Sequence, residues 1–229
     1  MNLHQPQDQE SEVELKNLAA VPHQIISPAN NKAIIGFFQD NLLGAYRISR
    51  ENINFTPREA MNLLMAYNKV NELNLYKIFE KNGVISSFDI ITQIMPPLTM
   101  RYKTKRFKDN EEYKTSNNVL EILNGNYKRG QLEKTVLGDG TKGLIQRIYN
   151  DFGVEAAADF IDNLQNIITE YMKTSSFSVG ISDLIADDAT NQAIANAITN
   201  KKKEVKSLID QTHLGIFENK TGRTNEQEF

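Results

Sequence analysis

A dense run of basic residues, 101–108, is the first feature of the sequence that could do chemistry. Five of its eight residues are Lys or Arg, and Tyr102 and Phe107 are interleaved with them. Cations bind phosphate oxygens and aromatic rings stack on bases, so the pattern indicates a patch for nucleotide or nucleic-acid phosphates. The same pattern is typical of a solvated loop on an acidic protein. The residues alone leave both interpretations open.

Three other segments carry residue types used in phosphate or metal binding. The loop 138–143 is glycine-rich like a phosphate-cradling loop, but it lacks the Gly-x-x-x-x-Gly-Lys-Ser/Thr spacing, so a tight turn before a helix is the favoured interpretation. Asp183, Asp187 and Asp188 could bind magnesium, although a loop and a helix N-cap explain them better. The run 201–203, three lysines, is best explained as a solvated helix face.

Other kinds of site find no support. His4, His23 and His213 share no metal-ligand spacing, so no metal site is predicted. The absence of Cys excludes thiol nucleophiles, disulfides and zinc fingers, and it fits a reducing, intracellular compartment. A net charge of -3 gives no global basic field. No apolar stretch reaches the length of a membrane span, so no membrane partner is expected.

The β elements that would position these residues are short. The length of 229 residues suggests one or two domains. The apolar segments 25–26 and 34–38 are predicted to be buried strands on either side of a turn. Asn124–Gly125 is the favoured two-residue hairpin turn, and it follows the apolar run 119–123. Residues 101–112 are expected to form a charged loop.

Helical signals are more frequent than strand signals. Thr56 can cap a helix, Pro57 suits its first position, and Glu59 can close a capping box. The other predicted helices are 73–79 ending at Gly83, 88–95, 144–152, 154–174 and a long one that begins at Asp187 or Asp188. The residues alone therefore indicate a largely helical domain with a β part.

Two long, ordered sets of residues carry a resemblance to a known family. The first set is Met1–Gln7, Glu14–Leu15, Val21–Pro22, Gln24–Pro28, Asn31–Lys32, Gly36, Gln39–Asp40 and Leu43–Gly44. The second is Glu133–Val136, Gly143–Ile145, Phe160, Asn163–Gln165 and Gly180–Asp187. The chain resembles the largest subunit of multisubunit DNA-directed RNA polymerases of the RNA polymerase II type. The similarity is weak between residues 53 and 119.

The resemblance implies an α+β fold in which an irregular, β-containing pore domain is followed by long helices of the pore and funnel. Residues 1–20 would end the active-site domain, residues 21–175 would form the pore domain, and residues 176–229 would begin a funnel domain contained only in part. The polymerase would copy DNA into RNA from nucleoside triphosphates.

The resemblance also implies where the catalytic metal lies. In the family, magnesium is held by Asn-Ala-Asp-Phe-Asp-Gly-Asp immediately before Met-Asn-Leu-His, the sequence with which this chain starts. Magnesium would therefore be bound by residues outside this chain, and we expect the isolated chain to be inactive. Whether Met1 is a true start or a boundary stays open. No catalytic residue and no metal ligand is expected here.

Several residues gain a role from the resemblance. Lys134 stands where the family has a basic residue in the pore loop, while Thr135 replaces the second lysine that often follows. Gln39 and Asp40 match a polar pair near the active site. Asn2 and His4 would flank the metal-binding loop. Residues without a clear counterpart in the family could contact nucleotides at the pore rim: Arg101, Lys103 and Lys105.

The implied partners are those of a whole polymerase. They are the other subunits, including the second-largest, nucleoside triphosphates, the RNA 3′ end in the backtracked state, a transcript-cleavage factor at the funnel, and DNA. The resemblance implies a location in the nucleus. The Asn-, Ile- and Lys-rich composition is like that of large DNA viruses, and a viral protein would be located in a cytoplasmic virus factory or a virion. The alternative is a free-standing binding or assembly module of polymerase ancestry.

Overall fold

The computed structural model describes residues 3–67, 69, 83–108, 110–138, 140–218, 221–224 and 227. The chain divides into two units, Met1–Ser176 and Phe177–Phe229. The predicted helix 73–79 lies outside the described residues. In the described part of the chain, helices predominate over strands, and the strands form three small sheets, so the expected α+β class is confirmed.

The first unit starts with short elements around one small antiparallel sheet. They are α1 (Gln9–Glu14), the π-helical turn Leu15–Ala19, the 3-10 turn Val21–Gln24, β1 (Ile26–Ser27) and β2 (Lys32–Ala33). Ile26 pairs with Ala33, so the predicted first strand has a strand partner, but that partner is Lys32–Ala33 and not the predicted segment 34–38. The prediction of a buried strand at 34–38 is wrong, because Ile34 and Phe38 are exposed and Phe37 is the buried residue of that segment.

Helix α8 (Val154–Thr174) is the centre of the helical layer. It packs against α2 (Gln39–Ile48) and α7 (Leu144–Phe152), and more lightly against α3 (Pro57–Leu64) and α5 (Ser87–Ile94). Its apolar stripe was predicted from the i, i+3/i+4 spacing. The structure buries Phe160, Leu164, Ile167, Ile168 and Tyr171 of that stripe.

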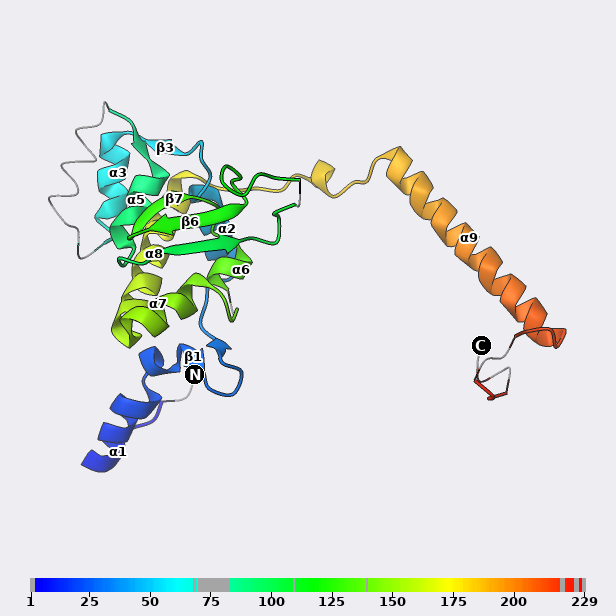
Figure 1. Cartoon of the computed structure of the whole chain (residues 1–229), viewed down its shortest axis with the longest axis horizontal. Coiled ribbons are helices and arrows are strands. Elements are labelled where there is room, and N and C mark those ends of the chain that lie inside the picture. Colours follow the sequence, from blue (N-terminus) through cyan, green and yellow to red (C-terminus); the bar gives the residue numbers. More distant parts are fainter. Residues whose placement is uncertain are drawn as a thin grey trace. The chain divides into compact units, whose positions relative to one another are not determined.

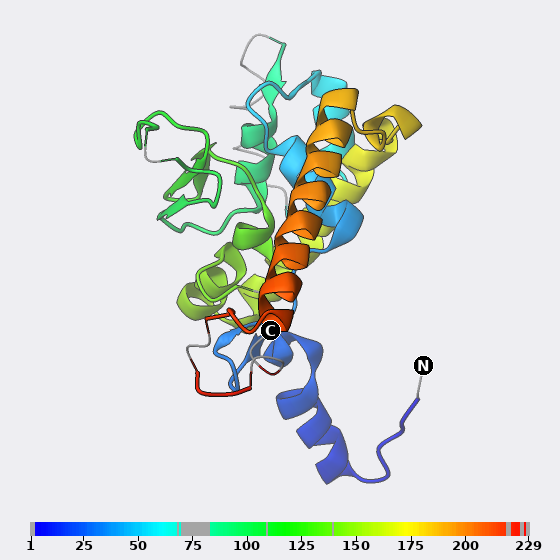
Figure 2. The ribbon, with the colours of Figure 1, turned by 90° about the vertical axis from the view of Figure 1, so that its right-hand side faces the viewer.

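A three-stranded antiparallel sheet lies on one side of these helices (Figures 1 and 2). Its order is β5 (Met100–Lys103), β6 (Val119–Leu123) and β7 (Asn126–Arg129). The predicted β6–β7 hairpin, with its turn at Asn124–Gly125, is confirmed. The expectation that the charged loop begins at Arg101 is wrong. Met100 and Tyr102 alternate with charged residues on β5 and pack against the core, which makes this segment a strand.

A smaller sheet joins β3 (Asn54–Phe55) to β4 (Ile85–Ser86). β3 precedes α3 in the chain, and β4 precedes α5. The short helix α6 (Lys134–Leu137) follows β7 and leads through a loop into α7.

The capping box predicted at the start of α3 is present. The Glu59 backbone N–H donates to Thr56 Oγ1 at 3.4 Å, and the Glu59 carboxylate accepts from the Thr56 N–H at 2.8 Å. We expect Thr56→Ala to lower the free energy of unfolding by about 1 kcal/mol, because it leaves N–H groups of the first turn without a side-chain partner. Urea unfolding checks this loss, and Thr56→Ser should restore most of it. Equal stability of Thr56→Ala and wild type would contradict the prediction.

The second unit contains the 3-10 turn Ile181–Asp183 and the long helix α9 (Asp188–His213), and none of its described residues is buried. The Asp187 side chain accepts from the Thr190 N–H at 3.0 Å, so it caps α9 as predicted. Hydrogen bonding from the Thr190 side chain, and then from its backbone N–H, lowers the pKa of Asp187 below its ordinary value.

Candidate functional site

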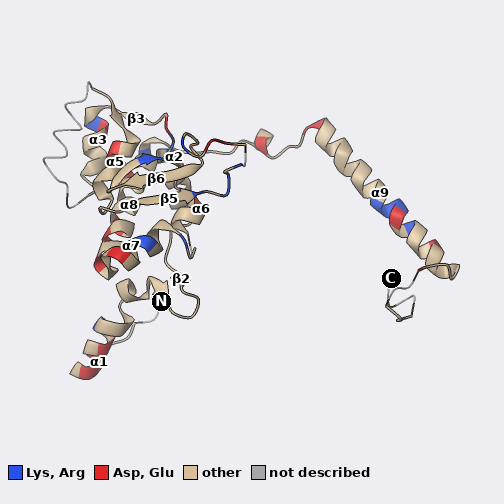
Figure 3. Cartoon of the chain, viewed as in Figure 1, with Lys and Arg blue, Asp and Glu red and all other residues tan. Residues whose placement is uncertain are grey.

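A cleft of about 600 Å³ opens beside the basic strand β5. Three segments form it: the end of β5 and the turn after it, the start of α6, and the loop between α6 and α7. Figure 3 shows Lys and Arg in the turn after β5 and in the loop before α7. The residues that line the cleft are Tyr102, Lys105, Arg106, Glu133, Lys134, Thr135, Gly140, Thr141 and Lys142. We refer to it as the basic cleft.

The basic cleft carries an excess of positive charge. Among the described residues that line it, Lys105, Arg106, Lys134 and Lys142 face a single carboxylate, that of Glu133. In the part of the chain that the structure describes, no ion pair involves Lys134 or Lys142. Because a concave surface lined by one sign of charge concentrates the opposite charge, the cleft attracts anions although the whole protein is slightly acidic.

Glu133 connects two of the three segments. Its Oε1 accepts the Lys105 backbone N–H at 3.1 Å and the Thr135 hydroxyl at 2.5 Å. Its Oε2 lies 3.8 Å from Arg106 Nε, and the Glu133 side chain is only 14% exposed. The carboxylate therefore holds the turn after β5 against the start of α6, next to Lys134.

Arg106 is fixed from a second side by helix α2. Its Nη1 donates to the Tyr46 hydroxyl at 2.7 Å, and its guanidinium carbon lies 4.9 Å from the centre of the Tyr46 ring. A guanidinium that stacks on an aromatic ring keeps its charge while it loses conformational freedom. Arg106 is thus positioned before any ligand arrives.

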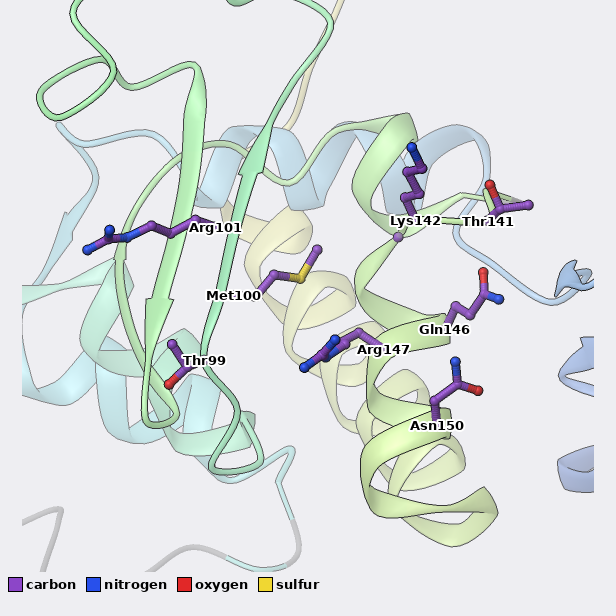
Figure 4. A pocket seen from close by; sticks show the side chains of 9 residues that line it. Thr99, Met100, Arg101, Thr141, Lys142, Gln146, Arg147 and Asn150 are labelled. Carbon is purple, nitrogen blue, oxygen red and sulfur yellow. The ribbon is translucent and has the colours of Figure 1, made fainter.

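A second pocket, of about 400 Å³, adjoins the basic cleft and shares Thr141 and Lys142 with it. Figure 4 shows that the Arg101 side chain points away from Lys142 and Arg147, although Arg101 is among the residues that line this pocket. Arg101 Nε instead donates to Glu121 at 2.7 Å. Arg147 pairs with Asp151 on its own helix, at 2.6 Å. This pocket therefore offers fewer uncompensated cations than the basic cleft.

The loop 138–143 works as the favoured interpretation predicted, as a tight turn before a helix. Gly143 is the N-cap residue of α7, and a Cβ placed on it would lie 2.7 Å from the Val136 carbonyl oxygen. Only glycine permits this approach, which brings Lys142 to the side of α6 that carries Lys134. The loop contributes side chains to the cleft, and its spacing is not that of a nucleotide-binding P-loop.

The structure brings together some of the candidate residues and separates others. Lys134 and Lys105 line one cleft, as a shared site requires. Lys103 instead lies over the rings of Phe107 and Tyr113, at 4.7 and 5.3 Å from their centres.

The remaining candidates lie elsewhere. Gln39 and Asp40 are exposed in the first turn of α2 and do not line the basic cleft. His4 is exposed near the N-terminus, and Asn2 lies outside the described residues. Sequence reasoning did not single out Arg106, Glu133 or Lys142 as site residues. The signals were there, since Arg106 belongs to the basic run and Lys142 to the glycine-rich loop.

The aspartates near α9 act as helix and turn caps. Asp183 Oδ2 accepts the Gly180 N–H at 2.8 Å, and Asp187 caps α9. Among the described residues, no group of three or more His, Cys, Asp or Glu side chains could hold a metal ion. A search of the same residues finds no helix with the length and apolarity needed to cross a membrane.

Comparison with known proteins gives the family. Residues 24–184 match the family described as RNA polymerase Rpb1, domain 3. Over all 229 residues the chain is 24% identical to two proteins of Trypanosoma brucei brucei, DNA-directed RNA polymerase II subunits RPB1-A and RPB1-B. It spans 13% of the length of each. The chain belongs to the RNA polymerase Rpb1, domain 3, family, and it is a segment of the largest-subunit type.

Proposed function

We propose that this chain forms the pore through which nucleoside triphosphates reach the active site of a DNA-directed RNA polymerase, together with the start of the funnel. Residues 21–175 would form the pore domain and residues 176–229 the beginning of the funnel domain. The observation that carries this proposal is the basic cleft, where Lys134 lies with three other cations. Family membership supports the assignment to a polymerase.

The charges of the cleft are better suited to attracting a nucleoside triphosphate and releasing it than to holding it tightly. Lys105, Arg106, Lys134 and Lys142 lie on an open surface, so water and salt weaken each interaction with a phosphate group. Clustered cations of this kind raise the local concentration of an anion and speed its arrival. A site that held the triphosphate tightly would slow its release toward the active site.

The chemistry of RNA synthesis belongs to other parts of the assembly. Transfer of a nucleotidyl group by a two-metal mechanism needs carboxylates that converge on magnesium. The described residues do not fit such a metal, because they contain no acidic cluster of the required size. We therefore propose that magnesium is held by another segment of the polymerase and that this chain alone is inactive.

The proposed partners follow from the same role. They are the other polymerase subunits including the second-largest, nucleoside triphosphates, the RNA 3′ end in the backtracked state, a transcript-cleavage factor at the funnel, and DNA through the whole complex. The polymerase would work in the nucleus, or in a cytoplasmic virus factory or virion if the protein is viral.

Lys134→Ala in the assembled polymerase tests the proposal. We expect the KM for nucleoside triphosphates to rise about threefold, with kcat nearly unchanged, because one exposed charge that attracts phosphate is worth up to about 1 kcal/mol. Steady-state RNA synthesis at varied nucleotide concentration measures both constants. Lys134→Arg should retain the wild-type KM. Lys173→Ala, which removes an exposed lysine of α8 outside the cleft, is the matched control. An unchanged KM in Lys134→Ala would refute the role of Lys134.

A further inference from the structure

The carboxylate of Glu133 is the unusual member of the basic cleft. Among the described residues that line the cleft, it is the one acidic side chain, and it is mostly shielded from water. A carboxylate repels phosphate, so its presence lowers the affinity that four cations would otherwise give. Its position therefore requires a reason other than the binding of an anion.

One reason is structural and is visible in the hydrogen bonds. Glu133 Oε1 accepts from the Lys105 N–H and from the Thr135 hydroxyl. A neutral amide oxygen has two lone pairs and can also accept both of these hydrogen bonds. Geometry alone thus explains an acceptor at this position, and it leaves the negative charge unexplained.

The charge acts on the cations themselves. Glu133 Oε2 lies 3.8 Å from Arg106 Nε, and Lys134 is the next residue along the chain. Arg106 has a second partner in Tyr46, which is uncharged and leaves the guanidinium charge uncompensated. Glu133 therefore supplies the negative charge against which an incoming phosphate must compete for Arg106.

We propose that Glu133 is a built-in counter-ion that keeps the affinity of the basic cleft for polyphosphate low. The inference rests on the proposed function, because weak binding is useful only where a triphosphate has to pass on. The cleft still attracts the anion through its net positive charge, and the carboxylate displaces the bound phosphate from Arg106. Without this charge, the cleft would bind polyphosphate more tightly and release it more slowly.

The test uses the full 229-residue chain and tripolyphosphate, a probe that carries the anionic part of a nucleoside triphosphate without base or sugar. Isothermal titration calorimetry measures its Kd for wild type and for Glu133→Gln, which keeps the acceptor oxygen and loses the charge. We expect the Kd of Glu133→Gln to fall about threefold to tenfold, as befits one charge close to the ligand in a partly exposed site. The gain should shrink as salt is added.

Glu170→Gln is the matched control. Glu170 lies on α8, pairs with Lys173 and does not line the cleft, so this variant makes the same change in net charge elsewhere. Its Kd should equal that of wild type. Glu133→Ala removes both the charge and the acceptor, and we expect it to gain less than Glu133→Gln, because the Lys105 N–H loses the partner that holds the turn in place.

The outcomes separate this inference from the proposed function. A Kd of Glu133→Gln equal to, or above, that of Glu170→Gln overturns the counter-ion, even if Lys134→Ala raises the KM of the polymerase and the pore role stands. A lower Kd of Glu133→Gln with an unchanged KM of Lys134→Ala supports the counter-ion and overturns the delivery role. If neither wild type nor Glu133→Gln binds tripolyphosphate, the counter-ion is overturned as well.

Discussion

Gly130→Ala is expected to lower the free energy of unfolding by about 4 kcal/mol, which is a large part of the stability of a domain. Gly130 has a φ of +104°, a conformation that residues with a Cβ rarely adopt. A Cβ at this position would lie 2.4 Å from Leu120 Cα and 2.8 Å from Leu120 N. The strained conformation and the clash each contribute about 1–3 kcal/mol. Because the clashing atoms are backbone atoms of the central strand β6, no side-chain rotation relieves it.

The control for Gly130→Ala separates strain from clash. Gly153, between α7 and α8, has a φ of +90°, but apart from its own neighbours in the chain no atom lies within 4 Å of a Cβ placed there. Gly153→Ala should therefore cost only the conformational strain, about 1–3 kcal/mol. Urea unfolding of both variants measures the two losses. If they are equal, the contact with Leu120 is not what makes Gly130 necessary.

The sheet that contains Gly130 shows how far sequence reasoning reaches. The β6–β7 hairpin was predictable, because Asn124–Gly125 is a local signal and the strands on its two sides are adjacent in sequence. Strand β5 was not, because its partner β6 lies 16 or more residues away and its charged residues are typical of a loop. Gly130 likewise gave no signal, since its closeness to Leu120 arises only when the hairpin folds.

The basic cleft, like the sheet, could be predicted from the sequence only in part. Lys134 was found through the resemblance to RNA polymerase, and Lys105 through the density of positive charge. Neither source could show that the two residues share a cleft, because 29 positions separate them and tertiary packing joins them. Tyr46 on α2 holds Arg106 in place, but no sequence pattern indicates this role. Gln39 and Asp40, on the same helix, drew attention through the resemblance but do not line the cleft.

The second large effect is expected from Glu121→Ala. Glu121 on β6 accepts from Arg129 Nε at 2.9 Å and from Arg101 Nε at 2.7 Å. Glu121 and Arg129 are 13% and 12% exposed, so removal of the carboxylate leaves a poorly hydrated guanidinium without its counter-charge. We expect a loss of about 3 kcal/mol in the free energy of unfolding, at the lower end of the range for a broken buried pair. The loss stays at that end because Arg129 also donates to the Tyr113 and Ser116 carbonyls.

The pH dependence of this loss identifies the charge of Glu121 as its cause. Burial raises the pKa of Glu121, but the hydrogen bonds and charges of Arg101 and Arg129 outweigh it, so the pKa lies below the ordinary value of 4.5. The unfolded chain therefore takes up the proton first as the pH falls. The stabilisation is complete above about pH 4.5 and disappears as the pH falls through the lower pKa of the native state.

Glu121→Gln tests that sign, because glutamine keeps the size and the acceptor oxygen of glutamate. Unfolding by urea between pH 7 and pH 3 should show the largest difference from wild type near neutral pH, and a smaller one in acid. A difference that is constant with pH would mean that the side chain stabilises the sheet through its shape alone.

The hydrogen bonds of Glu121 and Arg129 also affect the basic cleft. Arg129 holds the backbone of Tyr113 and Ser116 in the segment that connects Lys105 and Arg106 to β6. Loss of Glu121 should therefore also weaken the binding of tripolyphosphate at pH 7, although Glu121 does not line the cleft.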